Sequence, residues 1–290
     1  MKPFLQNLLV RPACRGSLVF EESTATCKVC QVVYPVRAGI PALIPNDSPF
    51  RDLPDPATPP HSAGLLPPWA RRLVRPYLEF NPPLTMWFDR SLFQCLNCCS
   101  ADMRILNIGS GVGRFDSELS PHLNFVNLDI SLQGQVDVVA DAHWLPFPNE
   151  SFHAVYSNAV LEHVQRPWRV AEEIYRVLRP EGRIFINVPF LNIIHDTHDY
   201  FRFTDKDLDI LFARFRKMAG GVSAGPSSFL GPFPVEYIPC GILGPYLKAL
   251  VRPLLNLLAW PVKYFDLPIR RSPTLRLTAD AFYFAGIKQG

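Results

Sequence analysis

Three glycines lie within five residues, directly after a short apolar run. The run RILNI ends at residue 108, and Gly109, Gly111 and Gly113 follow it. A tight turn without Cβ atoms lets a ligand approach the backbone, and a helix that begins after it offers free N–H groups. The spacing differs from the G-x-G-x-x-G fingerprint of dinucleotide enzymes, because Arg114 stands at the third glycine position. The motif predicts a cofactor-binding turn, with a plain strand-to-helix turn as the alternative.

Two aspartates and an asparagine follow the next apolar runs. Asp129 lies near the end of the run NFVNLDI, where a carboxylate can accept hydrogen bonds from both hydroxyls of a ribose. Asp141 follows the run VDVVA, and Asn158 ends the run FHAVYSN. Because ligands bind beyond the carboxyl ends of parallel strands, we expect these side chains near the glycine turn. A solvated loop carboxylate is the alternative for both aspartates.

A dense polar cluster follows the run RIFINVPF. It consists of His195, Asp196, His198, Asp199, Tyr200 and Arg202. A histidine beside a carboxylate is the usual general-base arrangement, because the acid orients the ring and raises its basicity. Two alternatives stay open: metal ligation by the histidines and aspartates, and a hydrogen-bonded loop in which Arg202 pairs with Asp199. His163 is expected in a supporting or cofactor-pocket role, and His143 and His153 in surface loops.

Strand-like runs and helical patterns alternate from residue 104 onward. Residues 166–178 place Val170, Ile174 and Val177 on one helical face, with Pro167 near the start. Strands are predicted at 104–108, 124–130, 136–140, 152–158 and 183–190, with a final strand in 277–290. The alternation predicts a parallel sheet covered by helices on both faces.

The motifs together resemble the class I S-adenosylmethionine-dependent methyltransferases, specifically the methyltransferase type 11 group. They are ILNIGSGVG, LDI, ADAHWLPFPNESFHAVYSNAVLEHV and RVLRPEGRIFINVP, in that order within residues 104–188. The resemblance implies an α/β fold with a Rossmann-like, seven-stranded methyltransferase sheet. It places the final strand as the antiparallel partner in an edge hairpin.

The resemblance also implies roles for individual residues. Gly109, Gly111 and Gly113 would line the methionine part of S-adenosylmethionine, and Asn158 would lie near the same end. Asp129 would hold the ribose. Ile130 would flank the adenine, and Asp141, with Ala142 beside it, would bond the adenine amino group. A related HD…DYxRFT stretch in similar methyltransferases indicates a substrate-side role for His195, His198, Asp199 and Tyr200. Asn107 stands where the family usually has an acid. Its amide oxygen can accept a hydrogen bond without the charge attraction, so we expect weaker donor binding.

The first 46 residues read as a small β-rich unit with three cysteines. Cys14, Cys27 and Cys30 and the run VVYPVRAGIPALIP resemble the zinc-ribbon proteins that activate tRNA methyltransferases. Arg11 stands where that family has its first cysteine, and a structural zinc site almost always has four ligands. We therefore favour a metal-free remnant of the fold, used for docking a protein partner or presenting substrate. Zinc held by three thiolates and an outside ligand is the alternative.

Composition divides the rest of the chain. A Pro-rich linker is predicted at 47–69 and the methyltransferase domain at 70–290, with a helical, apolar insertion at about 225–272. Within it, residues 237–265 combine leucines with lysine and arginine, which would suit peripheral contact with a membrane or a substrate cap. We favour an insertion that packs on the sheet.

Charge and cysteine usage narrow the class of protein. The 290 residues carry a formal net charge of +3, so no nucleic-acid partner is expected. Seven cysteines are not the even framework of a small secreted domain, and no apolar run is long enough to span a membrane. We expect a cytoplasmic protein, peripheral to the inner face of a membrane if the insertion contacts lipid.

Three functions follow in order of support. The first is methyl transfer from S-adenosylmethionine to a small-molecule, glycoconjugate or lipid-linked acceptor. The second is a catalytically inactive adaptor, which Asn107 and the missing zinc ligand favour. The third is a nicotinamide-dependent oxidoreductase, which the glycine spacing disfavours.

Overall fold

The computed structural model describes residues 2–50, 102–111, 124–132, 134–194, 197–231, 254–255 and 258–290. Several predicted features lie outside these ranges. They are Gly113, His195, Asp196, most of the linker, the start of the domain at residue 70, and residues 232–253 and 256–257 of the insertion.

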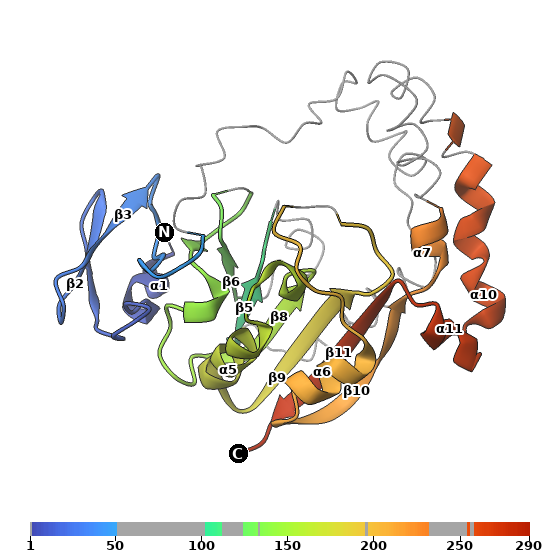
Figure 1. Cartoon of the computed structure of the whole chain (residues 1–290). Helices are drawn as coiled ribbons and strands as arrows, with labels where there is room; N and C mark the ends of the chain where they lie inside the picture. The colour runs from blue at the N-terminus through green and yellow to red at the C-terminus, as the bar shows by residue number, and fades with distance from the viewer. Residues whose placement is uncertain are drawn as a thin grey trace.

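A seven-stranded sheet forms the centre of the molecule (Figure 1). Its strands are β5 (Arg104–Ile108), β6 (Asn124–Asp129), β7 (Val138–Val139), β8 (Phe152–Asn158), β9 (Leu178–Pro189), β10 (Phe215–Ala224) and β11 (Ala281–Lys288). The spatial order is β10-β11-β9-β8-β5-β6-β7, and the strands from β9 to β7 pair in parallel. This is the expected Rossmann-like methyltransferase fold.

The final strand has its expected place. β11 is antiparallel to both neighbours and lies between β9 and β10, so it is the partner of β10 in an antiparallel hairpin at the edge of the sheet. β10 forms the edge, and the sequence did not predict it. Residues 216–220 of β10 are all exposed and include a glycine, so this edge strand lacks the apolar alternation that indicates a strand.

Short helices and turns connect the strands. They are η1 (Ala142–Trp144), η2 (Leu161–His163), α5 (Pro167–Val177), α6 (Asp205–Leu211), α7 (Ser227–Leu230), η3 (Trp260–Tyr264), α10 (Asp266–Ile269) and α11 (Pro273–Leu277). In α5, Pro167 occupies the first turn, and Val170, Ile174 and Val177 are fully buried. The predicted apolar face of this helix is therefore confirmed.

A second, small antiparallel sheet precedes the central one. It contains β1 (Leu18–Phe20), β2 (Thr24–Cys27), β3 (Val33–Arg37) and β4 (Ile40–Pro41), after the helix α1 (Pro3–Leu8). Its order, β1-β2-β3-β4, matches the chain order because hairpins join successive strands. The predicted β-rich N-terminal unit is present. We call residues 2–50 the N-terminal segment.

The N-terminal segment docks on the β7 edge of the central sheet. Ala42 forms a parallel bridge with Val139, and the Leu43 amide donates to the Val139 carbonyl over 2.7 Å. The Lys2 ammonium lies 2.7 Å from the Asp137 carboxylate. Leu43 is fully buried and belongs to the same apolar cluster as the strands. The segment thus extends the sheet edge and shares its core.

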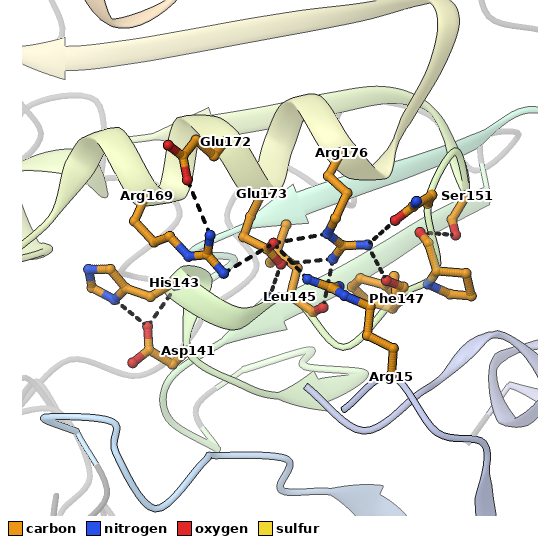
Figure 2. A network of polar contacts seen from close by, with 12 residues as sticks. Arg15, Asp141, His143, Leu145, Phe147, Ser151, Arg169, Glu172, Glu173 and Arg176 are labelled. Atoms are coloured by element: carbon orange, nitrogen blue, oxygen red, sulfur yellow. Dashed lines mark hydrogen bonds and ion pairs between the residues drawn. The ribbon is translucent and has the colours of Figure 1, made fainter. Parts of the chain in front are cut away.

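A buried carboxylate joins the N-terminal segment to α5 (Figure 2). Glu173 is 2% exposed and accepts hydrogen bonds from the Arg176 guanidinium over 2.8 and 2.9 Å. The Arg15 guanidinium donates to it over 3.1 Å, and the Leu145 amide over 2.9 Å. Because a buried charge is costly without partners, these donors hold α5, the loop after η1 and the N-terminal segment together.

Candidate cofactor site

The glycine turn after β5 needs glycine at its first position. Gly109 has φ +72°, and a Cβ there would lie 2.1 Å from Val160 Cγ2. Gly111 has φ +53°, and no atom of the described residues beyond its chain neighbours lies within 4 Å of the position that a Cβ would take. The amides of Gly109 and Ser110 donate to the Leu128 carbonyl over 2.8 and 3.1 Å. The backbone is therefore tied to the end of β6 and left uncovered at Gly111.

Asp129 organises this turn. One carboxylate oxygen accepts from the Gly111 amide over 2.7 Å, and the other accepts from the amide and hydroxyl of Ser131 over 3.0 and 3.1 Å. The side chain is half-buried at the end of β6. Each carboxylate oxygen can accept more than one hydrogen bond, so acceptor capacity remains for a ligand.

One cavity brings most of the predicted cofactor residues together. It has a volume of about 810 Å³ and lies beyond the carboxyl ends of β5 and β6. Its lining includes Gly109, Gly111, Asp129, Ile130, Asp141 and Ala142 from the central sheet, and Tyr34, Arg37, Ile44 and Phe50 from the N-terminal segment. A cavity of this size is within the usual range for small-molecule sites. The sequence did not predict that the N-terminal segment would form one wall.

Two predicted residues lie outside the cavity lining. The Asn107 side chain is buried within the sheet and donates to Asn127 Oδ1 over 3.1 Å. Asn158 accepts from the Asn187 side-chain amide over 2.8 Å, and Asn187 in turn accepts from the Ser223 hydroxyl. Both asparagines thus take part in polar contacts between strands.

Asp141 links the cavity to the N-terminal segment. It is 1% exposed, and its carboxylate accepts from the Ser48 hydroxyl over 2.5 Å. The His143 amide and ring Nδ1 bond the other oxygen over 2.9 and 2.6 Å, and His143 Nε2 accepts from the Arg166 amide over 3.2 Å. The neutral tautomer with hydrogen on Nδ1 satisfies both contacts. The expectation of a surface position for His143 is wrong: its carboxylate partner allows the ring to be fully buried.

We expect Ser48→Ala to lower the free energy of unfolding by about 1–3 kcal/mol, because it removes a donor from a buried carboxylate. Urea unfolding measures the change. Ser23→Ala is the matched control, since Ser23 is exposed, and should stay within about 0.5 kcal/mol of the parent. Equal effects of the two substitutions would contradict the assigned role of Ser48.

The loop after β9 is held by one arginine. Arg202 pairs with both oxygens of Asp199 and donates to the carbonyls of Asn192, Ile193 and Phe201. All five N–H groups of its guanidinium therefore have acceptors. The pairing of Arg202 with Asp199, which the sequence offered as an alternative to a general-base arrangement, is present, and it commits the Asp199 carboxylate to positioning this loop.

His198 brings the loop to the cavity. Its ring lines the cavity and packs edge-on against Phe50, with ring centroids 5.7 Å apart. The His198 carbonyl accepts from His163 Nδ1 over 2.8 Å, and His163 also lines the cavity. Tyr200 is 41% exposed, and its hydroxyl accepts from the Gln165 side chain over 3.3 Å. Among the described members of the polar cluster, His198 is the one in the cavity lining.

Two buried acids near Arg202 were missed by sequence reasoning. Glu162 is fully buried with no hydrogen bond to either carboxylate oxygen, and burial together with the charge of Asp199 raises its pKa to about 7. Asp280 is 7% exposed, and burial and the nearby Asp266 raise its pKa to about 7. The LEHV motif contains Glu162, but only tertiary packing shows that this side chain is buried.

The raised pKa of Glu162 predicts a stability change with pH. From about pH 4.5 to 7 the unfolded chain has released this proton while the folded chain keeps it, so stability falls as pH rises and levels off above 7. The full effect is at most about 3 kcal/mol. Glu162→Gln should therefore match the parent near pH 4.5 and be more stable by about 1–3 kcal/mol at pH 8. Urea unfolding at both pH values tests this, and an equal difference at both would contradict it.

The three N-terminal cysteines lie together. Cys14 Sγ is 3.6 Å from Cys27 Sγ and 3.7 Å from Cys30 Sγ, and all three sulfur atoms lie within 4.8 Å of one another. The hydrogen bond from the Gly16 backbone, despite partial desolvation, lowers the pKa of Cys14 to about 7. Within the described residues this cluster offers three thiolate ligands, one fewer than a structural zinc site uses.

Comparison with known proteins agrees with the fold. Residues 106–186 match the model of a family described as a methyltransferase domain. The chain is 27% identical over 177 residues to the demethylmenaquinone methyltransferase of Thermotoga maritima, covering 57% of this chain and 66% of that protein. A Haemonchus contortus phosphoethanolamine N-methyltransferase in complex with S-adenosyl-L-methionine aligns at 14% identity and TM-score 0.46, covering 69% of this chain and 52% of that one. The chain spans 14% to 55% of three further curated relatives.

A short relative matches over most of its own length. A UPF0434 protein of Baumannia cicadellinicola is 33% identical over 48 residues, which are 17% of this chain and 89% of that protein. The fold and the matched domain define the class: this is an α/β chain with a methyltransferase domain, a family whose cofactor is S-adenosylmethionine. Through its 48-residue match the chain also belongs to the UPF0434 family.

Proposed function

We propose that the chain transfers the methyl group of S-adenosylmethionine to a small-molecule or glycoconjugate acceptor. The observation that carries this proposal is the single cavity shared by the glycine turn, Asp129, Ile130 and Asp141, within the matched methyltransferase domain. When bound, S-adenosylmethionine supplies an activated methyl group on a sulfonium. The protein then has to bind the nucleoside and align the acceptor, because positioning carries much of the barrier to such a transfer.

The donor would occupy the wall formed by the central sheet. Gly109, Gly111 and Gly113 would line its methionine part, as the resemblance implies, and the first two lie in the cavity lining. Asn107 and Asn158 would act behind that end through the sheet. Asp129 would accept from the ribose hydroxyls. Ile130 and Ala142 would flank the adenine, and Asp141 would keep acceptor capacity for its amino group beside Ser48.

The acceptor would bind beside the loop that follows β9. We assign the base for a weakly acidic acceptor to His198 or His195, with His198 supported by its place in the cavity. Asp199 would hold the loop through Arg202, and Tyr200 would lie at its exposed side. The N-terminal segment would close the cavity from the other side through Phe50.

The proposal also includes the domain boundaries that the sequence predicts. Residues 1–46 would be a zinc-ribbon-like unit that also presents a surface to a protein partner, residues 47–69 a linker, and residues 70–290 the catalytic domain. The unit packs against β7 through the bridge between Ala42 and Val139. Part of its surface therefore already contacts its own chain, which supports a role for this unit in protein contacts. Cys14, Cys27 and Cys30 would hold zinc only with an outside fourth ligand. No helix in the described parts of the chain is long and apolar enough to cross a membrane.

Two titrations and an activity screen test the proposal. Calorimetry should show saturable binding of S-adenosylhomocysteine and none of NAD; the reverse result would favour an oxidoreductase. A screen with labelled S-adenosylmethionine and cell extracts should show methyl incorporation that His198→Ala reduces. The buried pairing of Asn107 with Asn127 is the observation that favours an inactive adaptor. Donor binding without incorporation into any extract fraction would support that second candidate.

A further inference from the structure

Phe50 lies between the two parts of the cavity that the donor and the acceptor would use. Its side chain is 7% exposed and lines the cavity at the end of the N-terminal segment. The ring packs edge-on against His198, with ring centroids 5.7 Å apart, and lies at 22° to the ring of His143, 6.5 Å away. His143 holds Asp141 in the proposed adenine subsite, whereas His198 belongs to the loop after β9. One ring from the N-terminal segment therefore contacts both sides.

The position of Phe50 depends on a short chain of hydrogen bonds that starts at Asp141. The Asp141 carboxylate accepts from the Ser48 hydroxyl over 2.5 Å, and the Ser48 hydroxyl oxygen accepts from the Phe50 amide over 3.1 Å. Ser48 is 6% exposed, so little water competes with these bonds. A change in the hydrogen bonds of Asp141 therefore acts on the backbone that carries the Phe50 ring.

His198 is held through its backbone and contacted through its ring. Its carbonyl accepts from His163 Nδ1 over 2.8 Å, which fixes the backbone beside η2. Its ring packs against Phe50 and, with centroids 6.3 Å apart, against Tyr200. Pairs of aromatic rings prefer edge-to-face or offset geometries, so the Phe50 contact selects among the orientations that the His198 ring can adopt. Loss of such a contact changes the population of one orientation by about two- to tenfold.

We infer that Phe50 is a positioning residue that couples donor binding at Asp141 to the orientation of the His198 ring. The inference rests on the proposed function, in which the adenine amino group of the donor binds Asp141. The donor would share that carboxylate with Ser48, and the resulting shift of the Ser48 hydroxyl would move the Phe50 ring against His198. His198, the base we assign for a weakly acidic acceptor, would thus take its working orientation once the donor is bound. Because coupling between two sites is reciprocal, the same contact strengthens donor binding.

NMR of the full chain with isotope-labelled histidine rings tests the inference. Each histidine gives a ring signal, and His198→Gln identifies the signal of His198. S-adenosylhomocysteine should shift this signal in the parent, in step with the saturation that calorimetry measures. In Phe50→Leu the His198 signal should already differ without ligand, because the ring current of Phe50 is lost, and it should no longer respond to S-adenosylhomocysteine. Phe50→Leu should weaken binding of this ligand by about two- to tenfold, because the wall formed by the central sheet remains.

Two further variants and a control separate coupling from a general loss of packing. Phe50→Tyr keeps the aromatic ring and should keep most of the shift of the His198 signal. Ser48→Ala also keeps the ring but removes its link to Asp141, so it should reduce the shift about twofold or more. Phe20→Leu is the matched control, since Phe20 is an aromatic residue of the same segment outside the cavity lining, and it should leave the shift unchanged. Urea unfolding confirms that each variant is folded.

The outcomes distinguish this inference from the proposed function. S-adenosylhomocysteine binding to the parent without a shift of the His198 signal would overturn the inference and leave the proposed function standing. An equal shift in Phe50→Leu, or an unchanged ligand-free signal in that variant, would also overturn it. If Phe50→Leu no longer binds the ligand, Ser48→Ala decides, and an undiminished shift there would refute the coupling. Absence of binding to the parent would overturn the proposed function, and this inference with it.

Discussion

Glu173→Gln is expected to lower the free energy of unfolding by about 3–5 kcal/mol. The carboxylate is 2% exposed and accepts from Arg15, Arg176 and the Leu145 amide. A glutamine keeps one acceptor oxygen but removes the charge that the buried guanidinium groups face. It also places an NH₂ donor against other donors. The loss should therefore exceed that of a typical surface substitution several-fold.

The neighbouring Glu172 provides the control. Its side chain is 58% exposed and pairs with Arg169, so Glu172→Gln should change stability by less than about 0.5 kcal/mol. Urea unfolding of the two variants at neutral pH gives the comparison. A Glu173→Gln loss below about 1 kcal/mol would show that the network in Figure 2 does not hold the N-terminal segment to α5.

The same comparison has a pH dependence. Burial by itself would raise the pKa of Glu173, but hydrogen bonds from Arg176 and the charges of Arg176 and Arg15 lower it below its usual value. A carboxyl group with a lowered folded-state pKa adds stability above its unfolded pKa and loses it as pH falls through the folded-state pKa. The gap between the parent and Glu173→Gln should therefore be full at pH 7 and narrow below pH 4.5.

Asp129→Ala is expected to weaken S-adenosylhomocysteine binding by about 100-fold or more. The substitution removes the proposed ribose acceptor and also the acceptor of the Gly111 amide, 2.7 Å away. Hydrogen bonds to charged groups contribute about 1.5–3 kcal/mol each, and two of them correspond to a change of this size. Calorimetric titration of the purified variant measures it.

Two further variants separate the roles of Asp129. Asp129→Asn keeps an oxygen for the Gly111 amide but loses the charge, so we expect a smaller loss of about tenfold. Asp209→Ala removes a carboxylate that pairs with Lys206 and Lys217 outside the cavity lining and should not change binding. If Asp129→Ala binds within threefold of the parent, the cavity is not the donor site.

Much of the central sheet could be predicted because its signals are local. The apolar runs at 104–108 and 152–158 are parallel strands in the structure, as predicted. The predicted apolar face of α5, which includes Val170 and Ile174, is buried. Positions at strand ends could also be predicted, since carboxyl ends of parallel strands share one edge. The edge strand β10 was missed because its exposed residues do not alternate with apolar ones.

The sequence by itself determined where the glycine turn lies, that Asp129 ends the next strand, and the order of the strands and helices around them. Residues a few positions apart carry this information. Only the tertiary structure decided that Ser48 would bond Asp141, that Arg15 would bond Glu173 and that Glu162 would be buried without a hydrogen bond. Ser48 and Asp141 are 93 positions apart, and Arg15 and Glu173 are 158 apart. Contacts over such separations depend on how the N-terminal segment packs against the sheet, which no local pattern of residues encodes.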